Sequence, residues 1–200
     1  MPTDSSSQTP VRRPRMTPDR EVELLNTALE VLREVGYEAM TMDAVATRGR
    51  CSKATLYRQW RSKPEMIAAA LYVTRPVSVE SIDTGSLRGD LMTLATQISE
   101  GSRKDTQIFA ALSHACLVDQ DLVRALREAL IDPEVTHLTR IVERAVERGE
   151  LAEWPAAAVF LPSLLLGVTT TRPILDGTYA DADYMTRFID HVLLPALTHS

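Results

Sequence analysis

The sequence has few of the residues that build β-sheets, disulfide frameworks or secreted proteins. Aromatic residues make up 5 % of the 200 residues, and stretches that alternate apolar and polar side chains are scarce. The two cysteines, Cys51 and Cys116, show no pairing pattern, and the first residues lack the apolar stretch of a secretory signal. We therefore expect an intracellular protein in a reducing cytoplasm, without a disulfide framework.

Long apolar runs are also few. The longest, residues 156–168, is 13 residues long before three threonines follow it, and Pro162 lies inside it. A helix that crosses a bilayer needs roughly 18–20 apolar residues, so we expect no membrane span. A helix that is apolar on nearly every side is instead typical of one that is buried on two faces.

The residues that are present favour an all-α fold. Leu, Ala, Glu and Arg dominate, and apolar residues recur at helical spacing, as in Val22, Leu25, Leu29 and Leu32. Thr17, Thr41, Ser52 and Ser62 are suitable N-caps, and Gly36 is a suitable end for the first helix. The helices expected from these signals span residues 18–36, 42–47, 53–59, a fourth from 63, then 86–100, 106–118, 121–130, 134–148, 155–171 and 181–194.

Charge is unevenly distributed along the chain. Residues 1–64 carry a balance of +3 and residues 65–200 a balance of −8, on a protein whose net charge is −5. From Ala44 to Pro64 there are six basic residues and no Asp or Glu. A local positive surface on an acidic protein indicates a polyanionic partner that meets one region only, and double-stranded DNA fits best.

The segment 53–59 has the size and the faces of a helix that reads DNA. At 100° per residue, Leu56 and Trp60 point together into a core. Such a helix is about 10 Å long and the major groove is about 12 Å wide. The opposite face offers Ala54, Thr55 and Arg58, with Arg48, Arg50, Lys53, Arg61 and Lys63 available for charge and phosphates. A solvated basic surface is the alternative, but it leaves two short capped helices joined by a tight turn unexplained.

The stretch GYEAMTMDAVATRGRCSKATLYRQWRSKPEMI resembles the N-terminal helix-turn-helix of the TetR/AcrR family of bacterial transcriptional regulators. The residues in register with the family pattern are Gly36, Thr41, Val45, Ala46, Ser52, Thr55, Leu56, Tyr57, Trp60, Ser62 and Lys63. The match covers about a quarter of the chain. The remainder is similar to the family only in its helical layout.

The resemblance implies a DNA-contact surface and a division of the chain. It places Lys53, Ala54, Thr55 and Arg58 at bases, Thr41, Tyr57 and Lys63 at phosphates, Met42 near the groove, and Arg12, Arg13 and Arg15 on an arm. Arg48, Arg50, Ser52 and Arg61 complete the expected surface. We expect a disordered basic arm over residues 1–17, a helix-turn-helix domain over 18–64, and a helical regulatory and dimerisation domain over 65–200.

One departure from the family pattern concerns the turn between the two short helices. The family usually has Ala-Gly-Val before the capping serine, where this chain has Gly49, Arg50 and Cys51. If the turn needs φ > 0 at Arg50, the non-glycine residue costs on the order of 1 kcal/mol. Either a phosphate contact compensates, or Gly49 absorbs the strain. Cys51 is most simply a small core residue.

The resemblance also implies that the second half responds to a ligand and dimerises through its last two helices. The apolar run and an amphipathic last helix support this, because a helix buried on two sides needs a partner subunit on one of them. The expected interface residues are Phe160, Leu164, Val168, Tyr184, Phe188 and Val192. Alternatively, both helices fill a monomeric core.

The effector pocket is weakly indicated. Its expected lining between the middle helices is Leu94, Ile98, Phe109, Leu112, Leu138, Ile141 and Leu165, with His114 and His137 as possible polar anchors. Plain packing explains each of these residues equally. His114 and Cys116 lie on different sides of a helix, so we expect no metal site, and no cofactor is indicated.

The sequence therefore predicts a homodimeric transcriptional regulator, a repressor that a small, largely apolar effector releases from a palindromic operator. No catalytic constellation is evident, so we expect no enzyme. Two alternatives stay open: a sequence-independent DNA-binding protein that uses the same basic surface, and a helical enzyme or carrier for hydrophobic molecules.

Overall fold

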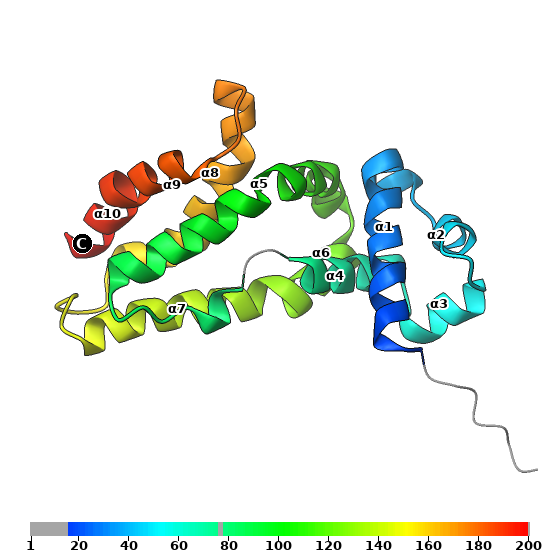
Figure 1. Ribbon diagram of the computed structural model, residues 1–200, viewed down its shortest axis with the longest axis horizontal. Helices are drawn as coiled ribbons and strands as arrows, with labels where there is room; N and C mark the ends of the chain where they lie inside the picture. The colour runs from blue at the N-terminus through cyan, green and yellow to red at the C-terminus, as the bar shows by residue number, and fades with distance from the viewer. Residues whose placement is uncertain (1–15, 76–77, 200) are drawn as a thin grey trace, which may run out of the picture.

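A computed structural model of the chain describes residues 16–75 and 78–199, with the side chains of residues 101–107, 109, 110 and 113 left out. Within these residues all regular structure is helical, which confirms the expected all-α fold. Three helices form one end of the molecule, and a helix of 32 residues runs through the rest of it (Figure 1). The expected arm, with Arg12, Arg13 and Arg15, lies outside the described residues.

The structure contains α-helices and, in its C-terminal part, short 3-10 and π-helical turns, which are labelled η. The first part of the chain forms α1 (Pro18–Ala39), α2 (Met42–Arg48), α3 (Lys53–Gln59) and α4 (Lys63–Thr74). The remainder forms η1 (Val79–Ser81), α5 (Leu87–Val118), α6 (Gln120–Leu126), η2 (Arg127–Ile131), α7 (Asp132–Glu147), η3 (Ala156–Phe160), α8 (Leu161–Asp176), α9 (Ala182–Phe188), η4 (Ile189–Leu193) and α10 (Leu194–Thr198).

The first four helices begin where the sequence predicts, because side-chain caps fix their ends. The hydroxyl oxygens of Thr17, Thr41, Ser52 and Ser62 each accept a hydrogen bond from the backbone N–H three residues later. Each such cap contributes about 1 kcal/mol. Gly36, with φ 76°, breaks the helical geometry of α1 at the predicted place, and one further turn follows it.

The prediction of two helices over residues 86–100 and 106–118 was wrong. One helix, α5, runs unbroken through 32 residues across this region, including Gly101. A glycine inside a helix costs only about 1 kcal/mol relative to alanine, which packing at both ends of α5 offsets. Buried side chains that anchor the two ends are Leu91, Leu94, Ile108 and Leu112.

Two prolines that suggested helix ends lie inside helical stretches instead. Pro133 falls in the first turn of α7, directly after η2, a π-helical turn in which the Asp132 N–H donates to the Arg127 carbonyl. This wider turn lets the chain stay helical up to a residue that has no N–H to donate. Pro173 lies inside α8, which continues to Gly177, where φ is 69°. The predicted breaks at both prolines were therefore wrong.

Two clusters of buried side chains hold the helices together. The first joins α1–α4 to α6 and the C-terminal end of α5, and the second joins the rest of α5 to α7–α10. Since α5 contributes to both clusters, it connects the two ends of the molecule. The domain boundary after residue 64 stays a prediction, because side chains on both of its sides share the first cluster.

A polar joint connects α1 to the end of α5. The Tyr37 hydroxyl donates to Asp119 Oδ2 at 2.8 Å, and Asp119 Oδ1 caps α6 by accepting from the Leu122 N–H. Lys63 Nζ donates to the Tyr37 carbonyl at 2.8 Å and lies 4.0 Å from the centroid of its ring. Burial, followed by the bond to Asp119, raises the pKa of Tyr37, so its hydroxyl remains a donor.

Replacing this tyrosine tests the joint. We expect Tyr37→Phe to lower the free energy of unfolding by about 1 kcal/mol at pH 7. Hydrogen bonds from the Leu122 N–H and the Tyr37 hydroxyl lower the pKa of Asp119, so the stability they provide is present above its unfolded pKa and is lost as pH falls through the folded value. Urea denaturation at pH 7 and pH 3 should give a smaller difference at pH 3. Equal differences would contradict this assignment.

Candidate nucleic-acid interface

Helices α1–α3, which we call the reading head, lie at one end of the molecule, with α2 and α3 outermost (Figure 1). Leu56 and Trp60 are buried in the first cluster, as the helical periodicity of α3 predicts. Their burial fixes the rotation of α3 about its own axis. The side chains that this rotation leaves exposed are Lys53, Ala54, Tyr57, Arg58 and Gln59, with Thr55 half-buried.

The turn before α3 is held against α1. Gly49 is buried, and a Cβ there would lie 2.5 Å from Leu24 Cδ2 and 3.0 Å from the Val45 carbonyl oxygen. The Arg20 guanidinium donates to the carbonyl oxygens of Gly49 and, at 3.4 Å, of Arg50. A side chain at position 49 therefore fits only if the buried Leu24 side chain shifts.

The structure locates the strain at Arg50. Its φ is 48°, a left-handed value found at no other non-glycine residue that the structure describes. Gly49 has φ −76°, which any residue adopts, so Gly49 does not absorb the strain. The departure from the family pattern therefore leaves the cost of about 1 kcal/mol on an arginine.

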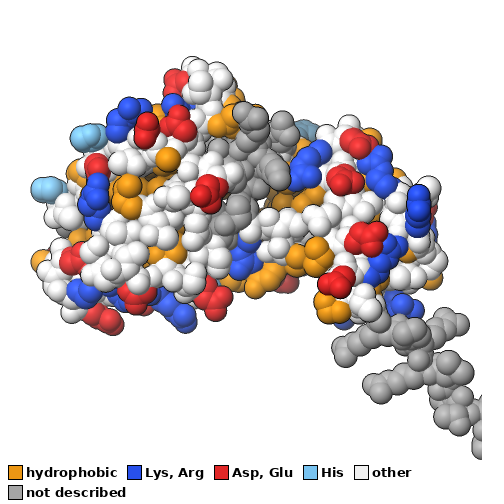
Figure 2. All heavy atoms as spheres, in the orientation of Figure 1, with side chains coloured by type: hydrophobic (Ala, Val, Ile, Leu, Met, Phe, Trp, Pro, Cys, Tyr) orange, Lys and Arg blue, Asp and Glu red, His pale blue; other side chains and the backbone are white. Residues whose placement is uncertain are grey.

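Two basic residues of the expected DNA surface have carboxylate partners. Arg48 Nη2 lies 2.6 Å from Glu34 Oε2 of α1, and Lys53 Nζ lies 2.8 Å from Asp43 Oδ2 of α2. The bond to Asp43 raises the pKa of Lys53, and the bond to Arg48 lowers the pKa of Glu34. Figure 2 shows such acidic side chains next to basic ones over the reading head.

The other basic residues of this surface differ in their surroundings. Arg50, Arg58 and Arg61 are exposed and form no ion pair with any described residue. Lys63 is half-buried on Tyr37, and burial lowers its pKa. One of its protons goes to the Tyr37 carbonyl, and its expected phosphate contact stays a prediction.

Three further positions of the expected surface lie on or near α2 and the start of α3. Thr41 and Ser52 are exposed, and their hydroxyl groups cap α2 and α3. Met42 is buried in the first cluster, so its side chain does not reach the surface on which the other expected residues lie. DNA contacts at Thr41 and Ser52 stay predictions.

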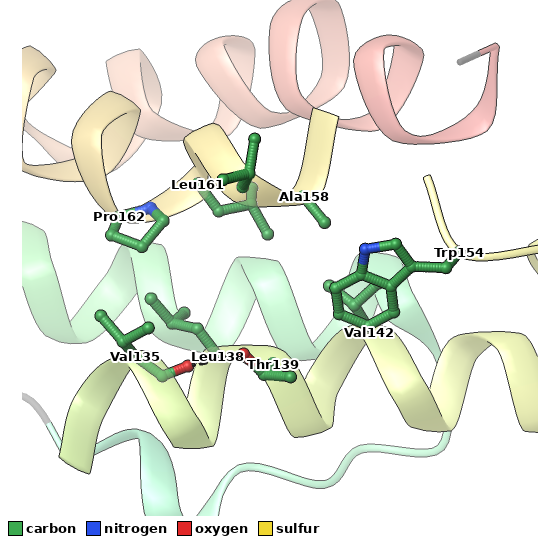
Figure 3. A pocket seen from close by; sticks show the side chains of 9 residues that line it. Val135, Leu138, Thr139, Val142, Trp154, Ala158, Leu161 and Pro162 are labelled. Atoms are coloured by element: carbon green, nitrogen blue, oxygen red, sulfur yellow. Dashed lines mark hydrogen bonds between the residues drawn. The ribbon is translucent and has the colours of Figure 1, made fainter. Parts of the chain in front are cut away.

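A cavity of about 310 Å³ lies in the C-terminal half, between α7 and the start of α8. The ring of Trp154 forms one side of it, and Leu138 and Thr139 of α7 face Leu161 and Pro162 across it (Figure 3). The remaining lining residues are Val135, Val142, Ala158 and Val159. Thr139 provides the polar hydroxyl in this lining, which donates to the Val135 carbonyl at 2.9 Å.

Most residues expected to line an effector pocket lie elsewhere, and Leu138 is the one that reaches this cavity. Leu112 belongs to the first buried cluster, whereas Leu94, Ile98, Ile141 and Leu165 pack in or against the second. His137 is half-buried, and the Phe109 side chain lies outside the described residues. Residues 135, 138, 139 and 142 are spaced so that they share one face of α7, which the sequence does show. Which helix face borders a cavity depends on how the helices pack, and the sequence does not show that.

His114 does not line this cavity, and its expected role as a polar anchor of an effector pocket stays a prediction. Its side chain is 74 % exposed, and Nε2 lies 3.5 Å from Glu38 Oε1 of α1. Among the described residues, His, Cys, Asp and Glu side chains form no group of three that could hold a metal ion.

The expected dimer residues lie on or near an apolar surface of the described chain. Phe160 is 60 % exposed and Val192 is also exposed, whereas Leu164, Val168, Tyr184 and Phe188 are half-buried. Two further apolar residues that the sequence analysis missed, Ile174 and Leu175, are 83 % and 78 % exposed. Both precede Gly177 at the end of α8 that projects from the molecule (Figure 1).

The helical stretch that contains the apolar run of residues 156–168 continues beyond it. The helical stretch Ala156–Asp176 contains 21 residues and its most apolar 18-residue window has a mean hydropathy of 1.4, so by length and composition alone it could cross a membrane. The helix continues through the threonines, and the Thr170 and Thr171 hydroxyls donate to backbone carbonyls one turn back. Only 22 % of its most apolar window is buried, so burial on two faces is not achieved within one chain.

Two family descriptions match the chain. Residues 24–70 match "Bacterial regulatory proteins, tetR family". Residues 81–192 match "Tetracyclin repressor-like, C-terminal domain". The first match covers most of the reading head together with most of α4, and the second covers the cavity, α8 and α9.

Individual proteins are similar over nearly the whole chain. An uncharacterised HTH-type transcriptional regulator of Mycobacterium tuberculosis is 36 % identical over 204 residues, which cover 100 % of this chain and 94 % of that protein. The DNA-binding transcriptional repressor TetR of Mycobacteroides abscessus is 34 % identical over 177 residues, 88 % of this chain and 92 % of the relative. The solved structure of the Flavonoid-responsive Regulator FrrA has a TM-score of 0.66 at 22 % identity, covering 90 % of this chain and 96 % of that one. At this identity the last comparison shows the fold alone.

The contact between Gly49 and Leu24 leads to a stability prediction. We expect Gly49→Ala to lower the free energy of unfolding by about 1–3 kcal/mol, because the added methyl group overlaps a buried leucine. Gly167→Ala is the matched control at concentrations at which the chain is a monomer: a Cβ on Gly167 of α8 meets no atom of its own chain within 4 Å, so the same change should be neutral or slightly stabilising. Urea denaturation measures both. If Gly49→Ala is as stable as the control, the turn does not depend on this contact.

Proposed function

Since the chain belongs to the tetR family of bacterial regulatory proteins and is a DNA-binding transcriptional regulator, we propose that it represses genes as a homodimer on a palindromic operator. A small, largely apolar molecule in its C-terminal half releases it. The observation that carries the proposal is α3, which has a capped start, two anchored core residues and an exposed face at the end of the molecule.

The exposed face of α3 offers the chemistry that a major groove requires. Arg58 is exposed and forms no ion pair with any described residue, so its guanidinium is available to bind the O6 and N7 atoms of guanine. Arg50 and Arg61 flank α3 and would contact phosphates, which position the helix without reading sequence. A phosphate at Arg50 would also offset the strain of its left-handed conformation.

The uncovered apolar surface of α8 supports a homodimer. Phe160, Ile174 and Leu175 are exposed in the single chain, and burying apolar surface contributes about 25 cal/mol per Å². A second copy that packs its own α8 and its continuous helical stretch from α9 to α10 on this surface would bury them in a four-helix interface. The twofold axis would place two α3 helices one helical turn of DNA apart, about 34–36 Å.

The cavity beside Trp154 is the proposed effector site. Its volume of about 310 Å³ lies at the lower end of the range for ligand pockets, roughly 300–1,000 Å³. The apolar lining and the indole ring suit a compact aromatic molecule, with Thr139 as the hydrogen-bonding group. FrrA is described as flavonoid-responsive, and a flavonoid has the size and chemistry that this cavity would accept.

A buried ion pair offers a path from the cavity to the reading head. Glu134 precedes the lining residue Val135, and its Oε1 lies 3.1 Å from Nε of Arg75, the residue that follows α4. The Arg75 guanidinium also stacks on the Tyr72 ring at 3.9 Å. A ligand that displaces the start of α7 would therefore displace the end of α4, which packs against α1. The ligand releases the protein from DNA only to the extent that it binds more tightly to a conformation in which the two reading heads no longer fit successive major grooves.

Substitution of two arginines tests the proposed roles on DNA. The operator is first selected from a pool of random duplexes, and a scrambled duplex of equal composition serves as the reference. We expect Arg58→Ala to weaken binding to the selected sequence by about 1–3 kcal/mol and to relax preference at one base pair. Arg61→Ala should weaken both duplexes alike and reduce the salt slope by about 1.

Both arginines are exposed, so neither change should alter folding. Uniform loss of affinity in both variants would show that Arg58 does not read bases. Equal affinity of the unaltered protein for selected and scrambled duplexes would favour the alternative of a sequence-independent DNA-binding protein.

The cavity makes a second prediction. Trp154→Ala should weaken binding of the flavanone naringenin by about tenfold or more, because the indole ring provides much of the contact area. Trp154→Phe, which keeps an aromatic ring, should retain most of the affinity. Calorimetry measures binding, and fluorescence anisotropy with the selected duplex measures release. If Trp154→Ala binds the ligand and leaves DNA as the unaltered protein does, the effector site lies elsewhere.

A further inference from the structure

Asp43 is the one acidic residue between Thr41 and Lys63, and it lies on the surface expected to face DNA. It occupies the first turn of α2, next to the capping residue Thr41. Its Oδ2 atom lies 2.8 Å from Lys53 Nζ, at the first residue of α3. The two side chains are 61 % and 55 % exposed, so the pair is at the surface of the reading head.

The surroundings of Lys53 explain why a carboxylate is useful there. A cation at the N-terminus of a helix is disfavoured by the helix dipole, and Asp43 offsets this. The ring of Tyr57 lies on another side of the ammonium group, with its centroid 5.9 Å from Nζ. The ammonium group is therefore held between a carboxylate and an aromatic ring, with two of its three protons available to a further acceptor.

We propose that Asp43 determines sequence specificity by holding Lys53 at the end of α3 that faces the groove and away from the phosphates. The inference rests on the proposed function, because it concerns how the same surface separates its operator from other DNA. Asp43 acts through Lys53 and is a positioning residue.

The two kinds of DNA complex should respond differently to the loss of this carboxylate. Binding to arbitrary DNA depends on the number of phosphates that the protein neutralises. Without Asp43, the Lys53 side chain can reach a phosphate in every such complex. On the operator, the N-terminal end of the recognition helix already lies at base edges, so Lys53 gains less there. Loss of Asp43 should therefore reduce discrimination.

A second ion pair of the reading head provides a contrast. Glu34 of α1 holds Arg48, at the C-terminal end of α2, at 2.6 Å. Arg48 lies outside α3, among the residues expected to contact phosphates. Releasing it should strengthen binding to operator and arbitrary DNA by the same factor, because a phosphate contact carries no sequence information.

The experiment compares three variants that each remove one negative charge. Asp43→Asn tests the proposal, and Glu34→Gln releases Arg48. Asp121→Asn controls for net charge, because Asp121 also lies in the first turn of a helix and pairs with a nearby arginine, Arg124, but belongs to α6. Fluorescence anisotropy gives the affinity of each variant for the selected and the scrambled duplex at several salt concentrations.

We expect Asp43→Asn to bind the scrambled duplex roughly three- to tenfold more tightly, with a salt slope steeper by about 0.9. Its affinity for the selected duplex should change less than about twofold on the same reasoning. Glu34→Gln should strengthen both by one factor, and Asp121→Asn should change neither. Asp43→Glu, which keeps the charge, should restore discrimination.

Equal changes on both duplexes, or none, in Asp43→Asn would overturn the proposal. Loss of an acid from the first turn of α2 removes a favourable interaction with the helix dipole and lowers stability. The binding assay is therefore run at a temperature at which thermal unfolding shows that the variant is folded. If the unaltered protein shows no preference for a selected duplex, the proposed function fails. If it shows a preference that Asp43→Asn leaves intact, only the role of Asp43 fails.

Discussion

The position of the recognition helix depends on the contact between Leu24 of α1 and the turn at Gly49. Leu24 is fully buried, and a Cβ on Gly49 would lie 2.5 Å from its Cδ2 atom, so the turn between α2 and α3 packs closely on α1. Arg20 holds the same turn through its carbonyl groups. The burial of Leu56 and Trp60 then fixes which face of α3 is exposed. The buried side chains of Leu24, Leu56 and Trp60 thus determine which side chains of α3 are exposed.

The reading head is packed against the regulatory half and has no separate core. The first buried cluster includes Ile108, Leu112 and Leu122 from α5 and α6, and two polar links, Tyr37 to Asp119 and Arg75 to Glu134, reinforce this contact. Packed helices tend to move as units, so a small displacement of α7 can alter the position of the reading head. This continuity is what an effector-controlled regulator requires, because ligand and DNA must bias the same conformational equilibrium.

The sequence predicted best what local chemistry decides. Caps at Thr17, Thr41, Ser52 and Ser62 and the two faces of α3 depend on residues within one or two turns of each other, so they could be read directly. The unbroken α5 and the helical stretches around Pro133 and Pro173 could not, because packing between distant helices offsets the local cost of glycine or proline. The cavity beside Trp154 and the acid partners of Arg48 and Lys53 likewise depend on how separate helices approach one another. The exposed face of α3 was therefore largely predictable from the sequence, whereas the cavity was not.

The central claim is that a twofold pair of subunits inserts α3 into successive major grooves of DNA. Methylation interference on the selected duplex tests it most directly, because methylation of guanine N7 blocks only the major groove. The account predicts two sets of interfering guanines, related by inverted symmetry and about 10 base pairs apart. Interference that is absent, or that forms one unrepeated set, would contradict it.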